Sequence, residues 1–108
     1  NLNELILYAR QGDLESYQEA TQIVLDRNPE FTDLAHVLTA VNSHGATALH
    51  MASANGHIDI LKFLLERLPT DGVNQANSEG NTALHWAAMS GKVESVRLLL
   101  QHQADPMV

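Results

Sequence analysis

The chain contains an internal sequence repeat with a period of 35 residues, and this repeat constrains the fold more than any other feature. Residues 42–67 align with residues 77–102, and 11 of the 26 aligned positions are identical. A period of this length is typical of stacked supersecondary units, each of which buries its apolar face against a neighbour. The sequence therefore predicts a repeat protein.

Each unit is predicted to contain two helices joined at a glycine. Thr47 and Thr82 precede the first helix of their units, where a threonine hydroxyl can accept a hydrogen bond from a free backbone N–H. The first helix is expected to end at Gly56 or Gly91, because a left-handed residue is needed there and glycine adopts that conformation without strain. These signals place one helical hairpin in each unit.

The second helix of each unit carries an apolar stripe. Its members recur at intervals of three and four, which places them on one face of a helix. Asp59 and Glu94 fall in the first turn, where the helix dipole favours an anion. Such short helices are not stable alone, so each pair must pack against the next. The stripe consists of Ile58, Leu61, Leu64 and Leu65 in one unit and Val93, Val96, Leu99 and Leu100 in the other.

These motifs resemble the ankyrin repeat. Residues 47–52 (T-A-L-H-M-A) and 82–87 (T-A-L-H-W-A) are similar to the ankyrin signature T-P-L-H-x-A, with alanine in place of proline. Gly56-His57 resembles the ankyrin glycine corner, and two extra residues in 68–72 lengthen the family period to 35. The resemblance implies an all-α ankyrin-repeat solenoid of stacked helix-turn-helix units with β-turn fingers.

The whole chain, residues 1–108, is predicted to form a single ankyrin-repeat domain. Residues 1–27 read as a degenerate N-terminal capping unit with its corner at Gly12, since terminal units face water on one side. Residues 28–41 form a long connection, in which Thr32 or Asp33 is expected to cap a short helix through residues 33–38. The second and third units are assigned to residues 42–76 and 77–108. The chain starts without methionine and stops where another unit would begin, which is consistent with a fragment of a longer protein.

The charge of the chain is acidic and uneven. Its net charge is −7, and residues 1–33 contribute −5 through seven acids and two bases. Such a balance disfavours nucleic-acid binding and suits a basic protein or peptide partner. The alternative, that the charge only keeps the protein in solution, stays open. No apolar run approaches the ~20 residues of a membrane helix, so no membrane partner is expected.

The sequence offers no candidate for catalysis, for a metal or for a cofactor. Cysteine is absent, and no serine lies in a nucleophile elbow. The ankyrin resemblance implies that His50 and His85 make structural hydrogen bonds, and His57 at the corner is given the same interpretation. The other histidines, His36, His44 and His102, have no partner at helical spacing for a metal site. The chain is therefore not expected to be an enzyme.

The resemblance also indicates where a protein partner would bind. In ankyrin proteins the finger tips and the end of each first helix line a concave groove, and packing leaves these positions free to vary. Trp86 has two interpretations, an edge of this groove or a core residue between units. The predicted partner-binding residues are Arg10, Gln11, Ser43, His44, Ala46, Ala54, Asn55, Ser78, Glu79, Asn81, Trp86, Met89 and Ser90.

Within the family, the chain resembles a fungal ankyrin-repeat chaperone of the small-subunit KH-domain ribosomal protein. The likeness lies in residues 9–14, 47–58, 80–93 and 104–106. It implies a monomeric escort, in the cytoplasm or the nucleus, that holds a basic client segment in its groove by acidic and apolar contacts. The first alternative is a general adaptor or inhibitor with an unrelated protein partner and salt-insensitive apolar recognition. The second is a spacer within a larger chain.

Overall fold

The computed structural model describes residues 2–27 and 34–105. This part of the chain is built of helices and turns and contains no strand. The predicted all-α fold is confirmed. The helices are α1 (Leu2–Gln11), α2 (Leu14–Arg27), α3 (Leu34–Leu38), α4 (Ala48–Asn55), α5 (Ile58–Arg67), α6 (Thr70–Val73), α7 (Ala83–Met89) and α8 (Val93–Gln101).

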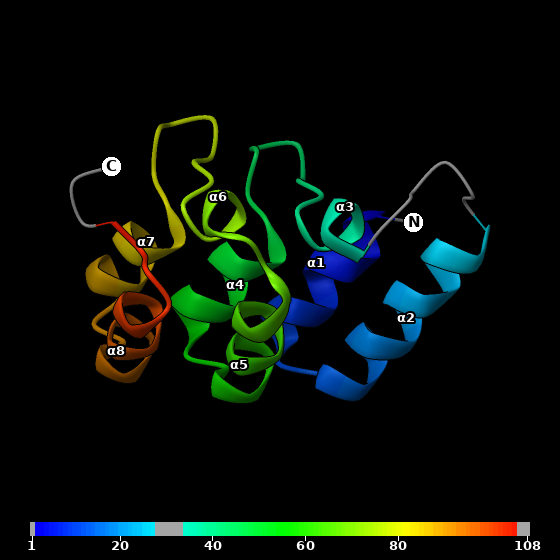
Figure 1. The fold of residues 1–108 in the computed structure, drawn as a ribbon, viewed down its shortest axis with the longest axis horizontal. Helices are drawn as coiled ribbons and strands as arrows, with labels where there is room; N and C mark the ends of the chain where they lie inside the picture. Colours follow the sequence, from blue (N-terminus) through cyan, green and yellow to red (C-terminus); the bar gives the residue numbers. More distant parts are fainter. Residues whose placement is uncertain (1, 28–33, 106–108) are drawn as a thin grey trace.

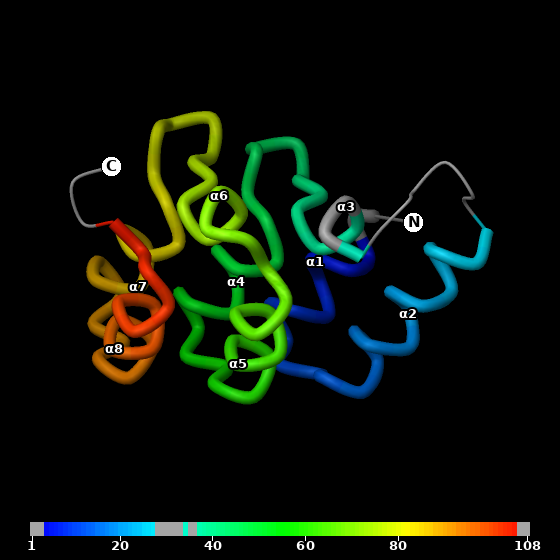
Figure 2. Tube along the Cα trace, viewed as in Figure 1, coloured from blue at the N-terminus to red at the C-terminus, as the bar shows by residue number. Residues whose placement is uncertain are grey.

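The helices lie in two layers that extend along one axis (Figure 1). The inner layer is α1, α4 and α7, in which each helix contacts the next. In the outer layer α5 contacts α8, while α3 contacts both α2 and α5. Each inner helix also packs on the outer helix that follows it in the chain. The hairpins therefore stack side by side, and the loops before α4 and α7 rise as two parallel fingers (Figure 2).

A threonine and a histidine cap the N-terminus of α4, and an equivalent pair caps the N-terminus of α7. The Thr47 hydroxyl accepts a hydrogen bond from the His50 main-chain nitrogen at 3.3 Å, and Nδ1 of His50 accepts from the Thr47 nitrogen at 3.1 Å. Thr82 and His85 reproduce both bonds at 3.4 and 2.9 Å. This reciprocal arrangement satisfies two backbone donors that a helix start leaves free. The predicted threonine caps are confirmed.

A left-handed glycine turns the chain between the two helices of every hairpin. The φ angles of Gly12, Gly56 and Gly91 are 82°, 70° and 70°. In the last hairpin α7 ends at Met89, so Gly91 lies one residue beyond the C-cap. Because one main-chain bond recurs at all three corners, it fixes which residues are equivalent. That bond joins Asp13 N to Tyr8 O (3.1 Å), His57 N to Ala52 O (2.9 Å) and Lys92 N to Ala87 O (3.0 Å).

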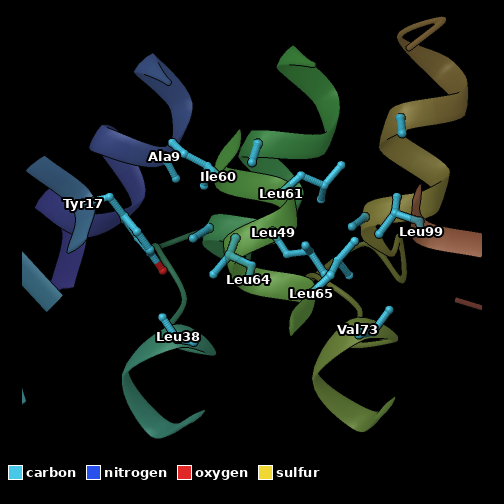
Figure 3. Close-up of a cluster of buried hydrophobic side chains, with 14 of the residues drawn as sticks. Ala9, Tyr17, Leu38, Leu49, Ile60, Leu61, Leu64, Leu65, Val73 and Leu99 are labelled. Carbon is cyan, nitrogen blue, oxygen red and sulfur yellow. The ribbon is translucent and has the colours of Figure 1, made fainter. Parts of the chain in front are cut away.

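The predicted apolar stripe of α5 forms the centre of the core (Figure 3). Leu61, Leu64 and Leu65 are buried together with Ile60, a position that the stripe did not include. In α8 the matching stripe is only partly covered. Leu99 is buried, whereas Val93 and Leu100 are 68% and 48% exposed, since no further described helix packs on that side.

The first hairpin has its own buried anchor in Tyr17. The Tyr17 ring meets the Phe63 ring edge to face at a centroid distance of 6.1 Å, and this contact joins α2 to α5. Burial raises the pKa of the Tyr17 phenol. At the start of α2 the Asp13 carboxylate accepts hydrogen bonds from the Ser16 hydroxyl at 2.7 Å and the Ser16 nitrogen at 3.1 Å. These bonds lower the pKa of Asp13.

The short helix α3 confirms the predicted helix in the first connection, and its predicted cap at Thr32 or Asp33 lies outside the described residues. Helix α6 was not predicted, because residues 68–72 read as a longer loop. It occupies the place below the second finger that α3 occupies below the first (Figure 2). Leu38 of α3 and Val73 of α6 are both buried. A short helix beneath each finger is therefore part of the repeating pattern.

Candidate protein-binding surface

Each finger is a β-turn that an asparagine side chain holds in shape. Oδ1 of Asn42 accepts hydrogen bonds from the nitrogens of His44 and Ala46 at 2.9 and 3.1 Å, and the Gly45 nitrogen donates to the Asn42 oxygen. Asn77 makes the equivalent bonds in the second finger. An Asx turn of this kind fixes the backbone of a short loop. The side chains at the finger tips, Ser43, His44, Ser78 and Glu79, are consequently exposed on ordered turns.

The two fingers are bonded directly to each other. The Ser78 nitrogen donates a hydrogen bond to the His44 oxygen at 3.0 Å. The approach is close, because a Cβ atom placed on Gly45 would lie 2.8 Å from the Ser78 nitrogen. Since Gly45 also has a φ of 76°, glycine is required there for both backbone shape and space. The fingers therefore present a single continuous edge.

His50 connects the second hairpin to the third. Its Nε2–H donates to the Asn81 oxygen at 2.8 Å, while its Nδ1 accepts from Thr47. This network requires the neutral imidazole with its proton on Nε2. Burial lowers the pKa of His50, against the opposing effect of the Asn81 hydrogen bond. The structural role expected for His50 is confirmed.

The shared corner bond shows which inner-helix residues stand in register. Leu7 in α1, Met51 in α4 and Trp86 in α7 each lie five residues before their corner glycine. Leu7 is 45% exposed, and Met51 and Trp86 are half-buried. Equivalent positions on neighbouring stacked helices lie side by side, so these three side chains form one apolar row. Neither Leu7 nor Met51 was predicted, although counting back from Gly12 and Gly56 would have identified both.

Two further positions on each inner helix belong to the same face. On each helix, the residues three and four positions after its member of the apolar row lie beside that member on the helix surface. We call the whole surface the inner-helix face. Its members are Leu7, Arg10 and Gln11 of α1, Met51, Ala54 and Asn55 of α4, and Trp86, Met89 and Ser90 of α7, with Met89 70% exposed.

A shallow pocket lies where the inner-helix face meets the first finger. Its volume is about 210 Å³. Leu7, Arg10 and Met51 line it from the helices, and Asn42 and Ser43 line it from the finger. A pocket with apolar walls and a few polar groups is suited to receive a side chain of a protein partner.

The structure leaves most of the predicted binding residues accessible and corrects one. Ala46 is 0% exposed beneath its finger, so a partner cannot reach it. Trp86 is partly a groove residue and partly a core residue. Its side chain is half-buried, and its ring centroid lies 5.1 Å from that of His50. Asn81 is half-buried, as is Ala54. The exposed predicted residues are Arg10, Gln11, Ser43, His44, Asn55, Ser78, Glu79, Met89 and Ser90.

The expected acidic groove is not found on this surface. The inner-helix face and the finger tips together carry one base, Arg10, and one acid, Glu79. The acids of the described N-terminal hairpin lie elsewhere, chiefly on α2 and at its start. Charge counted along the sequence did not show this, because it does not show which side of a helix carries the charge.

Across residues 2–27 and 34–105 no group of three or more histidine, aspartate and glutamate side chains is arranged to hold a metal ion. Among the helices of the same ranges, none has the length and apolar character needed to cross a bilayer.

The family model for ankyrin repeats in three copies matches residues 5–108. The chain therefore belongs to the ankyrin-repeat family, and its fingers, helix pairs and Thr-x-x-His caps are those of that family. The chain is also similar to a curated protein and to a chain of a solved structure. The first is the ankyrin repeat-containing protein YAR1 of Saccharomyces cerevisiae, 37% identical over 62 residues. That match covers 57% of this chain and 28% of YAR1, so the chain spans under a third of that relative.

The second similarity is to a solved structure. A chain in the crystal structure of the yeast ribosomal protein Rps3 in complex with its chaperone Yar1 is similar to this chain with a TM-score of 0.80 and 35% identity. The superposition covers 99% of this chain and 73% of the other. The likeness therefore extends through both fingers and all three helical hairpins.

Proposed function

We propose that this chain is the ankyrin-repeat part of a chaperone that holds a small-subunit ribosomal protein, with Rps3 or its counterpart as the client. The observation that supports it most directly is the apolar row Leu7–Met51–Trp86 with its adjoining pocket, accessible in a chain that matches the Rps3–Yar1 structure along 99% of its length. A client segment laid across this row would bury apolar side chains and exclude water around them.

The proposal assigns each unit a part. Residues 1–27 cap the stack, residues 28–41 connect it to the second unit, and residues 42–76 and 77–108 present the two fingers. The protein acts as a monomer and without catalysis, cofactor or metal. It escorts its client in the cytoplasm and into the nucleus, and it protects the client's basic surface from aggregation and from nonspecific RNA.

The deciding experiment combines purification from cells with a binding measurement. The tagged full-length protein is purified from its source cells, and bound proteins are identified by mass spectrometry. Recombinant protein is then titrated with purified yeast Rps3 by calorimetry. Recovery of the small-subunit KH-domain protein and saturable binding of Rps3 support the proposal. Absence of that protein from the purified complex, together with no binding of Rps3, would refute it.

A general adaptor or inhibitor is the second candidate. The near-neutral character of the inner-helix face favours it, because a neutral apolar surface does not by itself select a basic partner. The two candidates differ in the identity of the bound protein and in salt dependence. An adaptor would recover an unrelated partner, with an affinity that changes little with ionic strength.

A further inference from the structure

A second groove lies between α1 and α2, which supply all of its lining residues. These helices form the end hairpin of the stack (Figure 1). Its volume is about 410 Å³, roughly twice that of the pocket beside the first finger. Tyr8 of α1 and Ala20, Ile23 and Val24 of α2 give it an apolar floor. No motif in the sequence pointed to it.

The groove lies along the edge of the core, because Tyr8, Ala20 and Val24 are partly buried against the core and also line the groove. Leu5 and Ala9 are buried in the core, whereas Glu4 and Tyr8, each one position earlier, line the groove. On α2 the lining residues run from Ser16 to Arg27. At 1.5 Å per residue this stretch is about 16 Å long, which matches roughly three turns of a helix laid alongside.

The charge around this groove is negative. Glu4 and Glu19 line it together with one base, Arg27. Over residues 2–27 there are five acids and two bases, a balance of −3. On α5 and α8 acids and bases are equal in number, and Glu94 pairs with Arg97 at 2.7 Å. The groove therefore combines a net negative set of lining residues with the exposed apolar side chain of Ile23.

We propose that the end groove binds a basic amphipathic helix of the protein partner. Its apolar side chains cover Ile23 and Tyr8, and its lysines or arginines face Glu19 and the other acids of α2. Such a helix would pack on α1 and α2 as a neighbouring unit packs in the stack. This inference rests on the proposed function for the partner's identity, and it explains how a chain with a neutral inner-helix face selects a basic client.

The chemistry of the groove can be tested without the client. The probe is an amphipathic peptide of leucine and lysine, about four helical turns long, and its counterpart carries glutamate at every lysine position. The peptides are titrated into the full chain by fluorescence anisotropy and by ¹⁵N NMR. The lysine peptide is expected to bind and to shift the amide signals of Tyr8, Ala20 and Ile23, whereas the glutamate peptide is not. Binding of both peptides, or shifts confined to the inner-helix face, would overturn the proposal.

A matched pair of variants tests the same groove. The double variant Glu19→Lys/Ile23→Ser reverses one charge and removes one exposed apolar side chain of the groove. Glu66→Lys/Val93→Ser makes the same changes on α5 and α8. The groove variant is expected to weaken lysine-peptide binding by about tenfold or more, and the control to leave it within about twofold. Circular dichroism confirms that both variants fold. Equal losses would show a nonspecific charge effect and would refute the proposal.

Titration with Rps3 separates this inference from the proposed function. If Rps3 binds and only the groove variant weakens it, both proposals stand. If Rps3 binds equally to the wild-type chain, the groove variant and the control variant, the end groove is not its site. The inference then fails, while the proposed function stands. If Rps3 does not bind but the lysine peptide does, the proposed client is wrong and the groove's chemistry remains supported. A dimer in sedimentation that the groove variant abolishes would instead assign the groove to a second copy.

Discussion

The His57 imidazole joins the first hairpin to the second through its Nε2–H, which donates to the Arg10 main-chain oxygen at 2.8 Å across 47 residues of sequence. The ring lies directly over Gly12. A Cβ atom on Gly12 would lie 2.5 Å from Nδ1 of His57. The corner of one unit is thus a steric and hydrogen-bonding partner of the corner of the next.

Replacement of Gly12 by alanine should destabilise the fold more than the same change at Gly91. Both glycines are left-handed, and alanine in that conformation costs about 1–2 kcal/mol. Only Gly12 has a neighbour in the way, since nothing lies within 4 Å of a Cβ on Gly91. Moving the His57 ring would also lose its bond to Arg10, worth about 1 kcal/mol. Urea unfolding of both variants measures the difference, and equal losses would contradict it.

The glycines of the two fingers form a second matched pair. Gly45→Ala should weaken the bond between Ser78 and His44, because the new methyl would meet the Ser78 nitrogen at 2.8 Å. Gly80→Ala has nothing within 4 Å and pays only the left-handed strain of about 1–2 kcal/mol. Hydrogen exchange at the Ser78 amide should accelerate in the first variant and stay unchanged in the second. Slow exchange in both variants would show that the hydrogen bond between Ser78 and His44 persists after a methyl group is added at position 45.

The stability of the protein should fall as the pH drops below about 6.5, the ordinary pKa of histidine. Because burial lowers the pKa of folded His50, the unfolded chain takes up its proton first. The stabilising contribution is therefore complete above the unfolded pKa and is lost as the pH falls toward the folded one. Protonation would place a donor on Nδ1 against the Thr47 N–H, which is itself a donor.

Thermal unfolding between pH 7.5 and pH 5 tests this role of His50. His50→Gln should lower the melting temperature at neutral pH and flatten its dependence on pH. His44→Gln is the control, because His44 is exposed at a finger tip and takes no side-chain part in the cap. If both variants keep the full pH dependence, other groups are responsible for it.

Partner binding should depend on the apolar row of the inner helices. Leu7→Ser removes an exposed apolar side chain and is expected to change the free energy of unfolding by less than about 1 kcal/mol. It should weaken client binding by about 1–2 kcal/mol, a typical value for an interface contact. Calorimetric titration with Rps3 gives the affinity. Val93→Ser, an exposed change on α8, should leave binding unaltered.

Trp86→Ala should reduce both binding and stability. Its ring contacts the imidazole of His50, so part of its effect is structural. The comparison with Leu7→Ser separates the two contributions, since Leu7 is the more exposed of these two members of the row. A loss of stability in Trp86→Ala without any change in affinity would assign this residue to packing alone.

The parts of the fold that the sequence predicted are those that local chemistry decides. Thr47 and Gly56 act within one turn of a helix, so their roles as cap and corner can be predicted from the local sequence. Ile60 was missed although it lies four residues before Leu64, because its counterpart in α8 is the polar Ser95 and the stripe was drawn from positions that are apolar in both units. Helix α6 was missed because a helix of four residues has no periodicity to read.

The site was predictable to the extent that it follows the hairpins. Positions such as Met89 and Ser43 could be placed by counting along the motif, and both are exposed. Ala46 could not, since its burial under the finger comes from the packing of the turn onto the helices. The end groove depends on what lies beside α1 and α2, which is information about neighbours that no single stretch of sequence contains.

Consecutive corners close with the same bond although 44 residues separate Gly12 from Gly56 and 35 separate Gly56 from Gly91. The number of residues between two corners therefore does not decide how the hairpins align. The hydrogen bonds at the corners set the register of the stack. A protein engineer could use this freedom: the outer helices can differ in length, as α2 with 14 residues and α5 with 10 already do, with the corner bonds unaltered.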